Sequence, residues 1–103
     1  MIGRATTPNS TNNDFKTLIE QCKVYNVDVY GHYSGGVIGQ SVDSNNTVCV
    51  KDTVVKNSKN YKIYGNRISN DSKGAGGIVG TTGGKSFVVN NCLVDSYTIQ
   101  SIQ

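Results

Sequence analysis

Short apolar stretches alternate with polar, glycine-rich stretches along the chain, and the same order of stretches returns. Residues 35–39 are Gly-Gly-Val-Ile-Gly, and residues 76–80 repeat this pattern as Gly-Gly-Ile-Val-Gly 41 residues later. The first three residues, Met-Ile-Gly, match the end of the same run. Self-similar segments in a fixed order are typical of repeat architectures, so the pattern predicts repeated short β-strands.

Two further blocks follow each glycine run in the same order. One block leads from an apolar residue through Cys or Thr to Val, and the other ends near a Tyr-Gly pair. Aligning the three passes predicts inward-facing ladders whose members lie over one another about 4.8 Å apart. The predicted core ladders are Ile19/Val50/Val89, Cys22/Thr53/Cys92, Val24/Val55/Val94 and Val29/Ile63/Ile99.

The repeat predicts an all-β fold, a parallel β-solenoid of about two to three coils with three short strands each. The expected coil units are residues 1–34, 35–75 and 76–103 of a single module. Length differences fall between the blocks, where surface turns tolerate insertions. A β-sandwich with coincidental similarity is the alternative to the whole fold. A helix over residues 14–22, capped by Asp14, is the alternative to one strand.

The composition changes this picture little. The 103 residues include 13 Val and 8 Ile but only 2 Leu, 2 Ala and 1 Glu. β-Branched residues favour strands, and the scarcity of strong helix formers argues against a helical bundle. No apolar run is long enough to span a membrane, and the charges that sum to +3 are scattered. We therefore expect no membrane insertion and no nucleic-acid partner.

The frame of the repeat predicts behaviour at the ends of the module. About two complete coils are present with a fragment at either end, so we expect a piece of a longer repeat array. Open solenoid ends present strand edges, which are templates for pairing. We expect self-association through these ends, head to tail, with residues 1–3 of one chain completing the last coil of another.

The Gly-Gly-Ile-Val-Gly run, followed by Val-x-Asn-Cys-x-Val and then a Tyr-x-Ile strand, resembles the GLUG-type repeats of large bacterial and protist surface proteins. The resemblance covers residues 35–101 and part of residues 1–34. It implies a right-handed parallel β-helix in an extracellular or cell-surface, adhesin-like protein with host or cell-surface partners. It implies no catalytic residues, because such repeats are structural.

Residues that could carry chemistry are dispersed along the chain. Cys22 and Cys92 lie two coils apart, too far for a disulfide, and adding Cys49 gives neither a zinc spacing nor a disulfide framework. The only histidine is His32, and the sequence singles out no serine or acid as its partner. We therefore expect free thiols, no enzyme activity, no metal and no cofactor.

Residues 80–86 are glycine-rich and end in Lys-Ser, but they do not form a phosphate-binding loop. That motif requires a glycine where the chain has Val79, and a helix where residues 87–89 predict a strand. The six Asp and one Glu are spread without an acidic ladder. A catalytic pair of carboxylates is therefore not expected either.

Tyr30 and Tyr64 occupy equivalent positions and form the candidate ligand-contact surface, where tyrosines either bind a glycan or simply cover a strand face. Candidate glycosylation sites are Asn9, Asn45 and Asn70. The predicted function is that of a non-enzymatic structural or adhesive module of a surface or extracellular protein, assembling head to tail into filaments. A glycan-binding or polysaccharide-cleaving β-helix fragment is the alternative.

Overall fold

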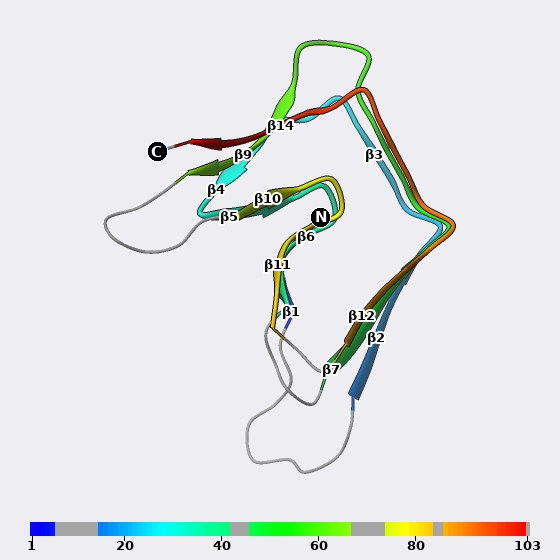
Figure 1. The fold of residues 1–103 in the computed structure, drawn as a ribbon. Coiled ribbons are helices and arrows are strands. Elements are labelled where there is room, and N and C mark those ends of the chain that lie inside the picture. Colours follow the sequence, from blue (N-terminus) through cyan, green and yellow to red (C-terminus); the bar gives the residue numbers. More distant parts are fainter. Residues whose placement is uncertain (6–14, 42–45, 67–73, 84–85, 103) are drawn as a thin grey trace.

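A computed structural model describes residues 1–5, 15–41, 46–66, 74–83 and 86–102, and all regular structure in these ranges is β-strand. The chain winds repeatedly around one axis, and each pass lies directly on the pass before it (Figure 1). Every strand pair is parallel. The fold is therefore the all-β parallel solenoid that the repeat predicts.

Each pass forms one rung of the stack. The first rung contains β1 (Ile2–Ala5), β2 (Phe15–Glu20), β3 (Lys23–Tyr25) and β4 (Val29–Gly31). The middle rung contains β5 (Tyr33–Gly35), β6 (Ile38–Ser41), β7 (Asn46–Lys51), β8 (Val54–Lys56) and β9 (Lys62–Asn66). The last rung contains β10 (Gly74–Gly76), β11 (Val79–Thr82), β12 (Ser86–Asn90), β13 (Leu93–Asp95) and β14 (Thr98–Ile102).

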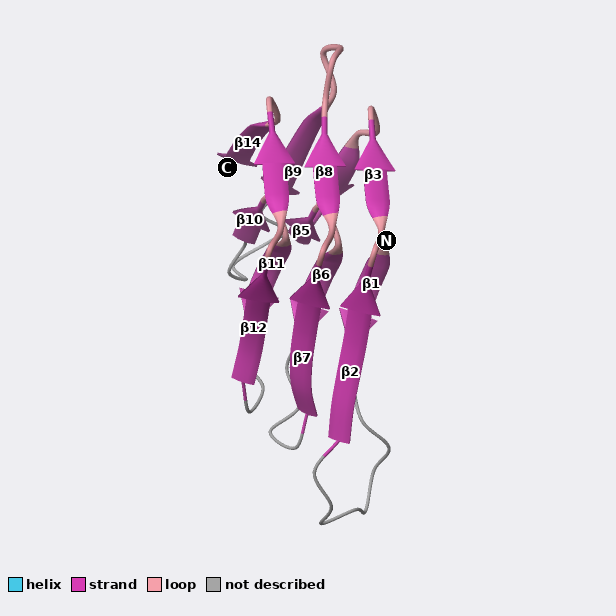
Figure 2. Cartoon of the chain, turned by 90° about the vertical axis from the view of Figure 1, so that its right-hand side faces the viewer, coloured by secondary structure: helices cyan, strands magenta, loops and turns pink. Residues whose placement is uncertain are grey.

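Equivalent strands of the rungs form five parallel sheets. Four sheets have three strands, in the orders β1-β6-β11, β2-β7-β12, β3-β8-β13 and β4-β9-β14, and the fifth pairs β5 with β10. Figure 2 shows the rungs side by side, with the first rung at one end and the last at the other. A full rung has five strands where the sequence predicted three, because the glycine run and the Cys/Thr block each bend in the middle.

The registers follow the alignment of the repeat. In the β2-β7-β12 sheet Ile19 pairs with Val50 and Val50 pairs with Val89. In the next two sheets the pairs are Val24 with Val55, Val55 with Val94, Val29 with Ile63, and Ile63 with Ile99. The helical alternative for residues 14–22 is wrong, because Phe15–Glu20 is strand β2 and pairs along its whole length with β7.

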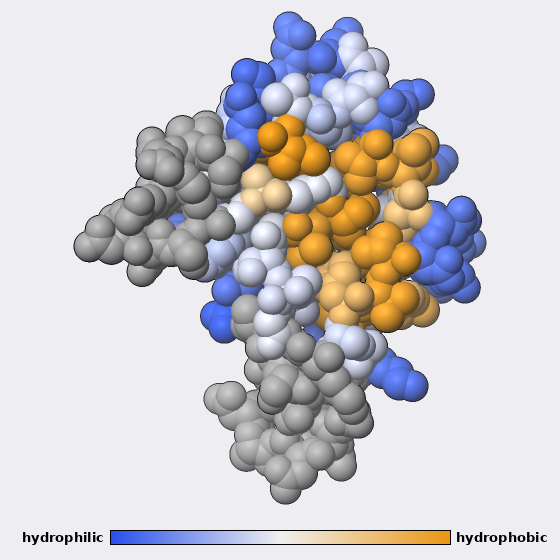
Figure 3. All heavy atoms as spheres, in the orientation of Figure 1, coloured by the Kyte–Doolittle hydropathy of each residue, from blue (hydrophilic) through white to orange (hydrophobic). Residues whose placement is uncertain are grey.

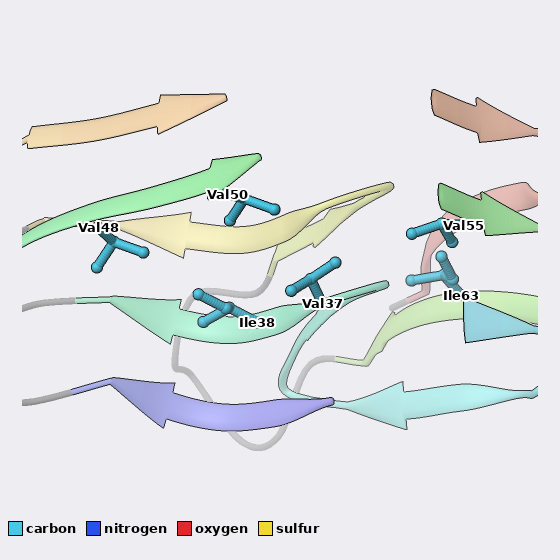
Figure 4. Packing of buried hydrophobic residues seen from close by; sticks show 6 residues of the cluster. All are labelled: Val37, Ile38, Val48, Val50, Val55 and Ile63. Atoms are coloured by element: carbon cyan, nitrogen blue, oxygen red, sulfur yellow. The ribbon is translucent and has the colours of Figure 1, made fainter. Parts of the chain in front are cut away.

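The hydrophobic core belongs to the middle rung. Among the described residues its buried apolar side chains are Val37, Ile38, Val48, Val50, Val55 and Ile63, and Figure 4 shows them between the surrounding strands. Apolar residues of the neighbouring rungs, such as Ile19 and Val24, pack against this cluster while remaining partly exposed. An inward-facing side chain such as Val50 is completely buried because a rung lies on both sides of it.

The corner between the β2 and β3 sheets is a column of residues in the left-handed conformation. Gln21, Asp52 and Asn91 have φ values of 55°, 50° and 53°. Asp and Asn tolerate this conformation better than most residues. The amide of Asn91 donates a hydrogen bond of 2.7 Å to the Asp52 carboxylate, which ties the corners of neighbouring rungs together.

The bend between β5 and β6 requires a glycine. A Cβ atom at Gly36 would lie 2.2 Å from the carbonyl oxygen of Gly77 and 2.8 Å from Val55 Cγ1. The equivalent position in the last rung is Gly77, where the three atoms nearest to an added Cβ all belong to the Val94 side chain, the closest at 2.8 Å. These glycines bring the first bend of the middle and last rungs close to the core.

The middle rung carries an insertion between β8 and β9, residues 57–61, which projects beyond β8 in Figure 2. Asn57 closes it from inside: its buried amide donates to the Tyr61 carbonyl at 2.9 Å and the Ser96 carbonyl at 3.3 Å. Beside it the two outer rungs meet directly. The Tyr97 hydroxyl donates to the Val27 carbonyl and accepts from the Val27 amide, each at 2.9 Å.

Candidate interaction surface at the open ends

The last rung leaves its inward-facing apolar side chains uncovered. Val89, Val94 and Ile99 are 50%, 38% and 41% exposed, whereas Val50, Val55 and Ile63, which they cover, are 0% exposed. Figures 1 and 2 together place this rung nearest the viewer in Figure 3, where apolar residues gather in the centre of the face. This surface, the C-terminal end face, is the interior of the solenoid seen end on.

Strand edges surround these apolar residues. β11, β12, β13 and β14 are each the outermost strand of their sheet among the described residues. A parallel strand directs alternate backbone N–H and C=O groups to each of its two sides. The outer edge therefore offers hydrogen-bonding groups to a further parallel strand.

The opposite end has the same cross-section with one gap. Ile2, Ile19, Val24 and Val29 are the partly buried apolar residues of the first rung. Below β5 the described chain has no strand, since β5 pairs only with β10. A hollow of about 160 Å³ lies there, and its lining includes Val29, Tyr30 and Ser34. The Ser34 hydroxyl is buried without a hydrogen-bond partner.

Outward-facing side chains form columns along the stack, and the charges in each column determine whether neighbouring rungs attract or repel. The column Glu20–Lys51–Asn90 places opposite charges on neighbouring rungs. The column Tyr25–Lys56–Asp95 also places opposite charges, those of Lys56 and Asp95, on neighbouring rungs. Lys16 and Lys23 each pair with an uncharged residue of the middle rung, Thr47 and Val54. None of these described columns holds two like charges.

Two of the three cysteines share a corner column with Thr53. Cys22 lies one residue before β3 and Cys92 one residue before β13. The three side chains have the same local geometry: the Cys22 thiol, the Thr53 hydroxyl and the Cys92 thiol each donate to the carbonyl two residues back, at 3.4, 2.9 and 3.5 Å. Cys49 pairs with Leu18 and Val88 on the outer face of its sheet. All three thiols are free.

The two candidate ligand-contact tyrosines lie on adjacent strands. Tyr30 pairs with Tyr64, and their ring centroids are 5.7 Å apart with an interplanar angle of 74°. This edge-to-face geometry is favourable between aromatic rings but does not make a flat platform. The repeat predicted the Tyr30–Tyr64 pairing correctly, whereas the orientation of the two rings depends on side-chain packing that the repeat does not encode.

A hollow on the outer face was not predicted. It has a volume of about 270 Å³ and is lined by Tyr25, Asn26, Lys56 and Ser58. Asn26 accepts a 2.7 Å hydrogen bond from the Ser58 amide, so the inserted loop forms one wall. The insertion was visible in the sequence as a longer spacing between blocks. The contact of this loop with Asn26 could not be predicted, because the direction of a loop leaves no periodic signal in a sequence.

The remaining candidates for chemistry stay apart in the described residues. The Asp28 carboxylate accepts from the Lys62 amide at 2.8 Å, and Asp52 accepts from Asn91. His32 contacts the ring of Tyr33, with centroids 4.4 Å apart. No group of three metal-ligating side chains occurs in this part of the chain. Asn9, Asn45 and Asn70 lie outside the described residues.

Comparisons with protein-family models, with curated proteins and with solved structures give no match. Within the described ranges there is also no helix of the length and apolarity needed to cross a membrane. The candidate site therefore rests on the geometry of the chain itself.

Proposed function

We propose that this chain is a non-enzymatic structural module that stacks end to end on copies of itself and so extends one continuous β-solenoid. The observation that carries the proposal is the exposure of Val89, Val94 and Ile99, whose middle-rung equivalents are completely buried. Covering a half-exposed Val or Ile side chain contributes on the order of 1 kcal/mol. Backbone hydrogen bonds along the free edges add to this.

A second copy is the occupant that fits this face. Apart from the gap below β5, its first rung has the same cross-section as the rungs that already stack within the chain, and it presents apolar residues at equivalent positions. In the register that continues the ladders, Ile2 of the second copy lies over Val79, and three further apolar pairs follow. These are Ile19 over Val89, Val24 over Val94 and Val29 over Ile99, by the pairings within the chain.

The polar columns are compatible with the same register. Across the joint, Lys16 of the second copy would lie over Ser86, Glu20 over Asn90, and Tyr25 over Asp95, by extension of the internal pairings. No like charges meet in these columns, and like-charge contacts are what destabilise neighbouring strands most directly. Stacking in this register therefore carries no electrostatic penalty from them.

The resemblance to GLUG-type repeats supports a surface or extracellular setting for such a module. A stack of parallel rungs resists bending because its backbone hydrogen bonds all run along the axis. We propose that the chain contributes a rigid, adhesive or stalk-like element whose outward side chains contact a cell surface.

The test compares two adjacent valines of β12 that point in opposite directions. Val89 faces inward and is 50% exposed, whereas Val88 faces outward and is 45% exposed. In reducing buffer, light scattering should show the wild-type mass rising with concentration. Val89→Asp should remain monomeric, and Val88→Asp should associate like the wild type. A monomeric wild type at every concentration, or identical behaviour of the two variants, would contradict the proposal.

Glycan binding is the second candidate function, and the outer hollow is the observation that favours it. Tyr25 is 49% exposed there beside the Lys56, Asn26 and Ser58 side chains, a combination of aromatic and polar groups that suits a sugar ring. Tyr30, 66% exposed, offers another aromatic contact. Binding on a glycan array that disappears in Tyr25→Ala or Tyr30→Ala would support this function; an array without binding would remove it.

A further inference from the structure

The corner column Cys22–Thr53–Cys92 brings neighbouring rungs into direct hydrogen-bonded contact. The Cys22 amide donates to the Thr53 hydroxyl at 3.4 Å, and the Val54 amide donates to the Cys22 carbonyl at 3.0 Å. On the other side the Leu93 amide donates to the Thr53 carbonyl at 3.0 Å. These bonds fix the three corner residues one above another, at the spacing of adjacent strands.

Within one chain the two cysteines are separated by the whole middle rung. Two rungs correspond to about 9.6 Å, which exceeds the span of a disulfide. In a stack that continues the ladders, however, the first rung of a second copy lies directly on the last rung. Its Cys22 would then be one rung from Cys92, about 4.8 Å between Cα atoms, and disulfides form at roughly 4.4–6.8 Å.

We propose that the joint between two stacked copies is a redox-sensitive site, in which Cys92 of one copy and Cys22 of the next form a disulfide that locks the register. The proposal rests on the proposed stacking function. Cys22 is exposed and Cys92 is partly exposed, so neither residue is buried in the separate chain. The joint is noncovalent under reducing conditions and becomes covalent under oxidising ones.

The oxidant is a small-molecule disulfide such as glutathione disulfide. The thiolate of one cysteine attacks it, forming a mixed disulfide and releasing one glutathione thiol. The thiolate of the facing cysteine then attacks the protein sulfur of that mixed disulfide and releases a second glutathione. Two cysteine thiols are oxidised to one disulfide, and one glutathione disulfide is reduced to two thiols.

Cys49 provides an internal control. It lies in the middle rung, and its column neighbours are Leu18 and Val88. In a stack the nearest Cys49 is three rungs away, about 14 Å, which is too far for a disulfide. Any bond that includes Cys49 must therefore come from contacts outside the stack.

The experiment oxidises the full chain with a glutathione redox buffer at a concentration where it associates, and separates the products on non-reducing gels. The wild type and Cys49→Ser should give a ladder of covalent multimers. Trypsin should release the peptide 17–23 linked to the peptide 86–103. Replacing either corner cysteine by threonine should abolish the ladder, and the fold tolerates this change because Thr53 already occupies the middle of the column.

A mixture of the two single variants sharpens the test. Cys22→Thr retains Cys92, and Cys92→Thr retains Cys22, so an equimolar mixture contains the parts of one lockable joint. In a Cys49→Ser background it should give covalent dimers and no larger species. Each variant alone should give at most a small yield of dimer, because the one cysteine of each copy lies three rungs from that of the next copy in a stack.

Other results overturn the inference in distinguishable ways. If most disulfides join Cys22 to Cys22, join Cys92 to Cys92 or include Cys49, the copies meet in another arrangement. A 22–92 link in monomers would show that the two corners of one chain approach each other. Association in reducing buffer without a 22–92 link on oxidation would overturn the lock and leave the stacking function standing. Absence of association in reducing buffer, with no link on oxidation, would overturn both.

Discussion

The middle and last rungs carry the same pattern of residues in the same register, yet they differ in burial. Val50, Val55 and Ile63 are fully buried, whereas Val89, Val94 and Ile99 on the adjacent strands are about half exposed. The difference comes from neighbours and not from sequence, because the middle rung is covered on both sides. In a solenoid the same apolar residue stabilises the fold at an inner rung and offers a contact at an outer one.

The comparison can be tested most severely with a buried charge. Val55→Asp places a carboxylate in the centre of the stack, where no partner is available, and should cost on the order of 4 kcal/mol or more. Val94→Asp makes the same change at a half-exposed position and should cost below about 1 kcal/mol in the monomer. Circular dichroism during urea unfolding checks both. Equal costs would mean that Val55 is not in the interior, and Val55→Thr provides a milder variant should the charged one not fold.

The glycine bends offer a second contrast. Gly36→Ala should cost about 3 kcal/mol, because the added methyl meets the backbone carbonyl of Gly77 and cannot be accommodated by a rotamer change. The atoms nearest to the methyl added in Gly77→Ala belong to the Val94 side chain, which is 38% exposed, so we expect it to shift and the change to cost about 1 kcal/mol. Thermal unfolding of the two variants measures which of them loses more stability. A larger loss for Gly77→Ala would show that the last rung is packed as tightly as the middle one.

Removing apolar volume should give a smaller difference in stability between the middle and last rungs. Val50→Ala leaves a cavity between two rungs and should lower the free energy of unfolding by about 2 kcal/mol. Val89→Ala removes the same atoms from a half-exposed site and should lower it by about 0.5 kcal/mol when the protein is monomeric. If the two costs converge as protein concentration rises, the last rung is being covered by a second copy.

The smallest effect concerns the hydroxyl of the corner column. Thr53→Val removes one hydrogen bond to the Lys51 carbonyl and one from the Cys22 amide, and should cost about 1 kcal/mol. Thr53→Cys restores a donor like those of the neighbouring rungs and should recover part of this loss. Chemical denaturation measures the difference, and a Thr53→Cys variant less stable than Thr53→Val would contradict the assigned hydrogen bonds.

Much of the stack could be predicted because equivalent residues of a repeat must lie over one another. The pairing of Val24 with Val55 and of Tyr30 with Tyr64 needed only the order of the blocks. The corner at Gln21, Asp52 and Asn91 could not be predicted, because these residues share a backbone conformation and not a side-chain pattern. This hidden bend is one reason why the rung has more strands than the sequence indicated.

The contact between Tyr97 of the last rung and Val27 of the first rung could not be predicted from the sequence either. Tyr97 reaches Val27 across 70 positions only because the middle rung bulges outward at residues 57–61. A strict stack would place the middle rung between them. The apolar end face, in contrast, follows from the pattern once the fold is known. The exposed fraction of each side chain could not be predicted, because it depends on which rungs cover that residue.

The uniform direction of the strands gives the module an orientation. Because every pair is parallel, its two ends are different surfaces, and one of them has the hollow beside Ser34. A twofold arrangement would join like ends and reverse the strand direction at the seam. Any assembly that keeps the parallel ladder must therefore be polar along its length, with unequal growth rates at its two tips.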